Sequence, residues 1–213
     1  MKKTNEDWEA KLHVHKRHLP AGGFGARLFP EFEKRAKAAA AEVLRVKTSV
    51  EAVEFVLTIA RQAGARKVVS VESPLLKQAG LKSAFASAGI DFYDSQEEIA
   101  TYAPTADIGI SGVEFGIAES GSVCQDAYAI ESRLVSTLPP THIVFLDSNL
   151  IVPGLSEAFA ILSKAFDHGY VTFITGPSRT ADIEVVLTIG VHGPVRLVII
   201  AIDECPKEGE SAQ

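Results

Sequence analysis

Residues 67–93, KVVSVESPLLKQAGLKSAFASAGIDFY, contain the unit that decides the fold. The first five residues form a short β-branched run, which predicts a strand. The stretch from Pro74 to Ala88 predicts a helix that ends at Gly89, and Ile90 to Tyr93 predicts the next strand. A strand, a helix and a second strand in this order are typical of a parallel sheet whose strands are joined by a helical crossover.

The same alternation continues toward the C-terminus. Short apolar runs predict further strands at residues 106–111, 142–146, 171–174 and 196–202, with helices over 154–166 and 181–187. Residues 109–129 lack a helical pattern and predict a strand, a turn and a strand. We therefore predict a single α/β domain with a mixed, largely parallel sheet covered by helices on both faces.

The N-terminal quarter of the chain has a different composition. An Ala- and charge-rich stretch predicts a helix over residues 32–46, and a second helix is predicted over 49–63, with Ser49 as its N-cap and Gly64 as its end. Residues 1–47 contain 11 Lys and Arg against 6 Asp and Glu, a net charge of +5, and the remainder carries −11. We therefore divide the chain into a basic helical arm (1–48), an α/β domain (49–205) and a polar tail (206–213). The arm is either solvated or docks onto an acidic surface.

Composition excludes several classes of protein. No apolar run approaches the ~20 residues needed to span a bilayer, and no apolar core follows the two lysines at the start, so we expect a cytoplasmic protein. Cys124 and Cys205 are too few to hold an iron–sulfur cluster, which usually needs four thiolates. The N-terminal histidines have no acidic or thiol companions, so no metal site is predicted. Aromatic residues are not interleaved with the basic ones, which argues against nucleic-acid binding.

The first candidate site is the segment GIAESG, residues 116–121. Its two glycines allow the backbone to turn tightly and to present Glu119 and Ser120 to a ligand, with Gly121 completing the turn. A β-hairpin with a polar tip explains the same spacing equally well.

The second candidate is TGPSRT, residues 175–180, between a predicted strand and a predicted helix. Backbone N–H groups at a helix N-terminus, beginning near Gly176, would combine with the Ser178 and Thr180 hydroxyls and the Arg179 guanidinium to bind a carboxylate or phosphate. The segment is neither a Walker loop nor a dinucleotide fingerprint, so it does not predict a nucleotide. Simple helix capping, with Arg179 solvated, is the alternative.

Three further residues are weaker candidates. Asp182 could orient Arg179, although carboxylates are common in the first turn of a helix. His192 lies in a turn, GVHGP, where a neutral imidazole could act as an acid or base near pH 7 or simply cap the preceding helix. Arg133 is included as an anion ligand, although a surface arginine is ordinary.

Three strings, GIAESGS (116–122), SRLVSTLPPTHIV (132–144) and TFITGPSRTADIEVVLTIGVHGP (172–194), together resemble the lactate utilization protein C family, also called the LUD domain. The resemblance covers roughly residues 109–202. It implies a fold like that of phosphosugar isomerases, glucosamine-6-phosphate deaminase and CoA-transferases. It also implies a role in oxidising L-lactate to pyruvate beside two partner proteins that carry iron–sulfur clusters, with no cofactor on this chain.

Three hypotheses about function follow. The first is an accessory subunit of a lactate-oxidising complex, in which Glu119, Ser178, Arg179 and Thr180 line a site for a small acid, alone or in a homo-oligomer. The second is a free-standing enzyme that uses Glu119 or His192 as an acid or base on a phosphosugar or an acyl-CoA ester, an analogy with the fold alone. The third is a regulatory module that binds a metabolite without turnover.

Overall fold

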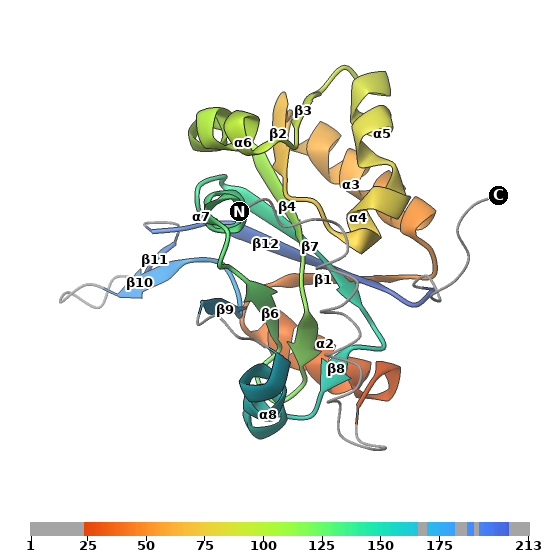
Figure 1. Ribbon diagram of the computed structural model, residues 1–213, viewed down its shortest axis with the longest axis vertical. Coiled ribbons are helices and arrows are strands. Elements are labelled where there is room, and N and C mark those ends of the chain that lie inside the picture. The colour runs from red at the N-terminus through yellow and green to blue at the C-terminus, as the bar shows by residue number, and fades with distance from the viewer. Residues whose placement is uncertain (1–23, 166–169, 182–186, 190–191, 205–213) are drawn as a thin grey trace.

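Figure 1 shows the computed structural model, which describes residues 24–165, 170–181, 187–189 and 192–204. The centre of the molecule is a six-stranded sheet with the order β1-β12-β7-β4-β2-β3. Every neighbouring pair in this sheet is parallel. Its strands are β1 (Glu42–Val46), β2 (Lys67–Ser70), β3 (Asp91–Tyr93), β4 (Ile108–Gly112), β7 (Thr141–Asp147) and β12 (Arg196–Ile202). All six strands therefore begin at one edge, the amino edge, and end at the other, the carboxyl edge.

Helices cover one face of this sheet. They are α3 (Ser49–Gln62), α4 (Pro74–Ala79) and α5 (Leu81–Ser87). Their buried side chains, such as Val56 and Phe85, form one core with Ile143 and Phe145 of β7. Alternate residues of β7 point the other way, so Val144 and Leu146 belong to a second core on the opposite face.

The opposite face is covered by α2 (Phe29–Ala38), which follows a short 3₁₀ turn (Ala26–Leu28), and by a second sheet of order β8-β5-β6-β9. This sheet comprises β5 (Phe115–Ile117), β6 (Ser122–Asp126), β8 (Ile151–Val152) and β9 (Val171–Ile174). Its outer side packs on α8 (Leu155–Ala165). Figure 1 shows these layers, with α3 to α5 to the right of β2 and β4, and with α2 and α8 below β1.

A smaller core lies beside β2 and β4. It is formed with α6 (Gln96–Tyr102), a 3₁₀ turn (Ala103–Thr105) and α7 (Ile130–Thr137). None of the helices within the described ranges is long and apolar enough to cross a membrane.

The predicted α/β architecture is confirmed, and its mixed character has a specific origin. The six-stranded sheet is wholly parallel, whereas antiparallel pairing occurs in the second sheet, where β5 and β6 form a hairpin and β6 pairs with β9. The predicted helix at 49–63 is confirmed as α3, although Thr48 rather than Ser49 caps it by accepting a hydrogen bond from the backbone N–H of Glu51. Gly64 follows it with φ 61°, as its predicted role as a stop requires.

The predicted helix over residues 32–46 is wrong in its second half. The helix ends at Ala38, Ala40 adopts φ 65°, and the chain reverses into β1. Alanine-rich sequence favours a helix locally, but Val43 and Val46 gain more by pairing with β12 and entering the two cores. The part of the predicted arm from α2 to β1 is thus packed into the body of the protein, and residues 1–23 lie outside the described residues.

Two other predicted helices differ from the structure. The helix at 74–88 is divided at Gly80, which adopts φ 64° between α4 and α5. The helix predicted at 181–187 is wrong at both of its ends, because Ala181 belongs to β10 (Arg179–Ala181) and Leu187 to β11 (Leu187–Ile189), and these strands pair antiparallel. Residues 182–186 lie outside the described residues.

Candidate functional site

The segment TGPSRT lies at the amino edge of the six-stranded sheet. The backbone N–H of Ser178 donates to the carbonyl of Pro194 at 2.8 Å, two residues before β12 begins. The Arg179 guanidinium donates to the carbonyl of Ala39 at 2.7 Å, three residues before β1 begins. Because β10 follows instead of a helix, the helix N-terminus on which the predicted anion site relied is absent from this described segment.

The contacts of this segment hold it against the C-terminal end of α2. A Cβ atom on Gly176 would lie 2.3 Å from the Ala39 carbonyl oxygen, so the loop can approach this closely only with glycine. Arg179 adds a positive charge at the same carbonyl, where the helix end carries partial negative charge. The side chain of Arg179 is nevertheless exposed, so its other N–H groups remain open to solvent or to an anion.

The segment GIAESG forms the turn of the β5–β6 hairpin. Glu119 accepts a hydrogen bond from the backbone N–H of Leu155 at 3.1 Å and so caps the first turn of α8. Gly121 has φ 67°, and a Cβ atom there would lie 2.1 Å from the backbone nitrogen of Ala36 in α2. The Ser120 hydroxyl is buried without a hydrogen-bond partner among the described residues. The turn is therefore the tip of a hairpin that packs against α2 and α8.

The remaining predicted residues are dispersed. His192 is exposed, and its backbone N–H donates to the Ser178 hydroxyl at 3.4 Å, which joins it to the TGPSRT segment. Arg133 stacks over the Tyr170 ring at 4.8 Å. Thr180 lies in β10, but its side chain and all of Asp182 fall outside the described residues. The structure therefore brings Ser178, Arg179 and His192 into one region, and no described hydrogen bond or ion pair links Glu119 or Arg133 to them.

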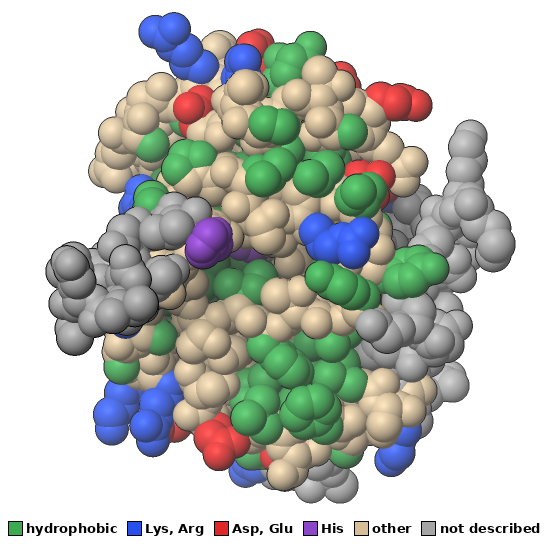
Figure 2. All heavy atoms as spheres, turned by 90° about the vertical axis from the view of Figure 1, so that its left-hand side faces the viewer, with side chains coloured by type: hydrophobic (Ala, Val, Ile, Leu, Met, Phe, Trp, Pro, Cys, Tyr) green, Lys and Arg blue, Asp and Glu red, His purple; other side chains and the backbone are tan. Residues whose placement is uncertain are grey.

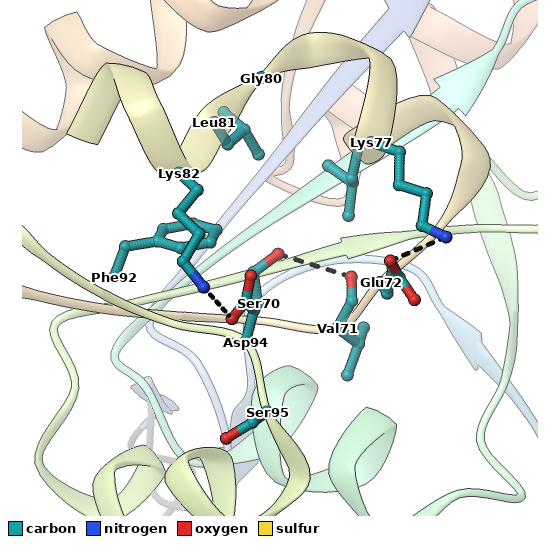
Figure 3. Close-up of a pocket in the computed structure, with 11 residues that line it drawn as sticks. Ser70, Val71, Glu72, Lys77, Gly80, Leu81, Lys82, Phe92, Asp94 and Ser95 are labelled. Atoms are coloured by element: carbon teal, nitrogen blue, oxygen red, sulfur yellow. Dashed lines mark hydrogen bonds and ion pairs between the residues drawn. The ribbon is translucent and has the colours of Figure 1, made fainter. Parts of the chain in front are cut away.

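A cavity of about 350 Å³ opens elsewhere, at the carboxyl ends of β2 and β3. Ser70 ends β2, Asp94 and Ser95 follow β3, and Lys77 and Lys82 enter from α4 and α5 (Figure 3). Apolar side chains, including Leu76, Leu81 and Phe92, complete its lining. This is the edge of an open α/β sheet at which ligands ordinarily bind.

Two ion pairs set the charge of the cavity. The Lys82 ammonium lies 2.8 Å from an Asp94 carboxylate oxygen, and the Lys77 ammonium lies 2.9 Å from one of Glu72. The hydrogen bond to Asp94 raises the pKa of Lys82, so this side chain stays protonated. Both lysines are exposed, and pairs of this kind contribute little stability and rearrange readily.

These lysines are not among the predicted site residues, because the sequence pattern predicts one continuous helix over residues 74–88. In a continuous helix, residues five apart point about 140° away from each other. The break at Gly80, with φ 64°, turns α5 relative to α4 and lets both lysines line one cavity. Gly80, a glycine in the middle of the helical pattern, is the feature of the sequence that could have indicated the break.

The thiol of Cys124 offers no metal chemistry. It is buried in β6 as a free cysteine, and burial raises its pKa, so it stays protonated. Cys205 lies outside the described residues. In the part of the chain that the structure describes, no three His, Cys, Asp or Glu side chains are grouped so as to hold a metal ion.

Comparison with known proteins supports the resemblance seen in the sequence. The model of the LUD domain family matches residues 29–202. Lactate utilization protein C 1 of Bacillus mycoides is 37% identical over 136 residues, which are 59% of this chain and 58% of that protein. The match therefore spans less than two thirds of that relative. Lactate utilization protein C of Halalkalibacterium halodurans is 32% identical over 74% of this chain and 72% of its own length.

One solved structure supports the fold. A duf162 family protein from Deinococcus radiodurans superposes with a TM-score of 0.56 at 22% identity, covering 83% of this chain and 97% of that one. At this level of identity the likeness concerns the architecture alone.

Proposed function

Because this chain belongs to the LUD domain family, we propose that it takes part in lactate utilization and binds a small carboxylic acid in the cavity at the carboxyl ends of β2 and β3. The observation that carries the proposal is the placement of two lysines in a cavity at the ligand-binding edge of a parallel sheet. Its volume, about 350 Å³, falls within the range of small-molecule sites, which run from roughly 300 to 1,000 Å³.

The lining residues suggest how such an acid would be held. The ammonium groups of Lys77 and Lys82 lie on opposite sides of the cavity (Figure 3), so the ligand carboxylate would pair with one of them, Lys82, while Asp94 keeps that lysine in position. Ser70 is buried, and its hydroxyl makes only a long contact of 3.5 Å with the Val71 carbonyl, so it can turn toward a hydroxyl or keto oxygen of the ligand. A carboxylate next to a hydroxyl or keto group is the chemistry that lactate and pyruvate share.

The redox step is assigned to partner proteins. Oxidation of lactate needs an electron acceptor, and we propose that iron–sulfur clusters on partner subunits supply it. This chain would then position the acid or assemble the complex. The experiment is to oxidise L-lactate with the purified partners with and without this chain. Oxidation at the full rate without it would contradict the proposed role.

The location of the acid site can be tested separately by calorimetry with L-lactate, pyruvate, phosphate and acetyl-CoA. The variants are Lys82→Gln in the cavity, Arg179→Ala in the TGPSRT segment, and Lys164→Gln on the exposed face of α8 as a matched loss of charge. A charge-assisted contact contributes ~1.5–3 kcal/mol, so Lys82→Gln should weaken binding roughly ten- to a hundredfold. Lys164→Gln should have no effect.

The opposite result is equally informative. If Arg179→Ala abolishes binding while Lys82→Gln leaves it unchanged, the acid binds at the amino edge as the sequence predicted, and the cavity proposal is wrong. If the wild-type protein binds only acetyl-CoA or only phosphate, and Lys82→Gln abolishes that binding, the ligand of the cavity is an acyl-CoA ester or a phosphorylated molecule and not lactate.

A further inference from the structure

A second group of polar side chains is buried between the two sheets. His142 is fully buried in β7, and its Nε2 lies 2.9 Å from the hydroxyl of Ser111 in β4. Its other ring nitrogen, Nδ1, has no hydrogen-bond partner among the described residues. Gln125 in β6 is 2% exposed, and both its amide nitrogen and its amide oxygen also lack partners there.

Strand alternation places these side chains in the same layer. In β7, Ile143 faces α3 to α5 and Val144 faces the second sheet, so His142 faces the second sheet as well. In β6, Cys124 packs toward α8 and Val123 toward the six-stranded sheet, so Gln125 faces the six-stranded sheet. The two side chains therefore enter the inter-sheet layer from opposite sides. Figure 2 shows a hollow near the middle of the molecular face that carries α7 and β9.

Unpartnered polar atoms in such a layer require an explanation. A buried donor or acceptor without a partner destabilises the folded state, and native proteins satisfy the great majority of such atoms with protein groups or ordered water. The unpartnered set here contains at least one donor and one acceptor on Gln125 and one nitrogen on His142. Two to four converging polar groups are what a buried water or a small polar solute needs.

We propose that the inter-sheet layer at His142 and Gln125 is a binding site for a small uncharged hydrogen-bonding molecule such as an amide or an alcohol, and that water fills it when no such molecule is supplied. The site is distinct from the lysine-lined cavity, which opens on the side of α4 and α5. It does not depend on the acid-binding role proposed above.

The charges around the layer favour a neutral ligand. Burial lowers the pKa of His142 to about 3, so the imidazole is uncharged at neutral pH and offers one donor or one acceptor at Nδ1. None of the side chains of Ser111, Gln125 and His142 supplies a positive charge that would balance a bound anion.

The test uses two probes of similar size, acetamide and acetate, titrated into the ¹⁵N-labelled full chain while the imidazole signals of His142 are followed by NMR. Saturable shifts with acetamide, in the millimolar range expected for so small a ligand, and none with acetate are expected. Gln125→Met, which keeps the length of the side chain but removes its polar atoms, should abolish the shifts. Ser122→Ala on the same strand should keep them, because its hydroxyl already pairs with Thr175 at 2.8 Å.

The outcomes decide the proposal even if Gln125→Met fails to fold. A crystal structure of the wild-type protein with acetamide should then show the molecule, and a structure without it should show ordered water, within hydrogen-bond distance of His142 Nδ1 and Gln125. An inter-sheet layer without density in both crystals, or imidazole shifts with acetate but not acetamide, would overturn it.

Discussion

At the scale of the residue, position 176 requires glycine because its backbone lies very close to the backbone of Ala39. A Cβ atom would lie 2.3 Å from the carbonyl oxygen of Ala39, and neither backbone can yield cheaply. Gly176→Ala should therefore destabilise the protein by about 1–3 kcal/mol, the usual cost of overpacking, which lowers Tm by roughly 2–4 °C per kcal/mol. Thermal unfolding measures this. Gly193→Ala is the control, since its Cβ would meet Ser178 at an ordinary 3.4 Å, and an equal loss there would contradict the argument.

His142 links the stability of the protein to pH. Burial lowers its pKa from 6.5 to about 3, so below about pH 6.5 the unfolded chain binds a proton that the folded protein excludes. Stability should thus be fully present above that pH and should fall by about 1.4 kcal/mol per pH unit as the pH drops toward 3. Urea unfolding at about pH 5.5 and about pH 4.5, both below the unfolded pKa, measures the slope. The double variant Ser111→Ala, His142→Phe removes both partners of the 2.9 Å contact and should flatten the slope by that amount; an unchanged slope would exclude His142 as its source.

At the scale of the element, the sequence predicts helices and strands correctly where the local hydrophobic pattern and the tertiary packing favour the same structure. Apolar runs in β4, β7 and β12 and the amphipathic spacing of α3 correspond to real elements because each is buried as its pattern implies. Errors arose where local preference and tertiary pairing disagree, as after Ala38 and at β10. The anion site inferred for TGPSRT depended on a helix there, so the error in the element became an error in the site. The lysine-lined cavity was missed because it depends on the break between α4 and α5.

That break makes Gly80 an element-scale determinant of the cavity. Gly80 has φ 64°, where alanine is strained, so Gly80→Ala should cost ~1–2 kcal/mol and favour a continuous helix that separates Lys77 from Lys82. We expect weaker binding of the acid as well as lower stability. Gly64→Ala is matched to it, with φ 61° and open space around the new Cβ, and should lose similar stability while keeping full affinity. Unfolding and calorimetry on both variants separate the two effects, and equal affinity in both would contradict a role for the break.

At the scale of the whole molecule, the two edges of the six-stranded sheet divide the candidate residues. The family-like segment around Arg179 docks at the amino edge, where Ala39 and Pro194 precede β1 and β12. The cavity lies at the carboxyl edge. The sequence pattern predicts where loops occur, but it does not predict at which edge of the sheet each loop lies. That position depends on the direction of the neighbouring strands and on which segments leave the six-stranded sheet to form the second sheet. The fold class could therefore be predicted from sequence, whereas the relative positions of its loops could not.

The boundary predicted at residue 48 is a property of the whole molecule, and truncation tests it. Phe29, Phe32 and Ala36 of α2 are buried against the second sheet, and β1 completes one side of the six-stranded sheet through five residue pairs with β12. A chain of residues 49–213 would expose this apolar surface and one flank of β12, an unpaired strand edge prone to association. We expect it to lose cooperative thermal unfolding or to aggregate, as followed by circular dichroism and light scattering. A chain of residues 24–213 keeps α2 and β1 and is the matched control. If residues 49–213 unfold cooperatively at the temperature of that control, the arm is separable and the α/β domain does begin at residue 49.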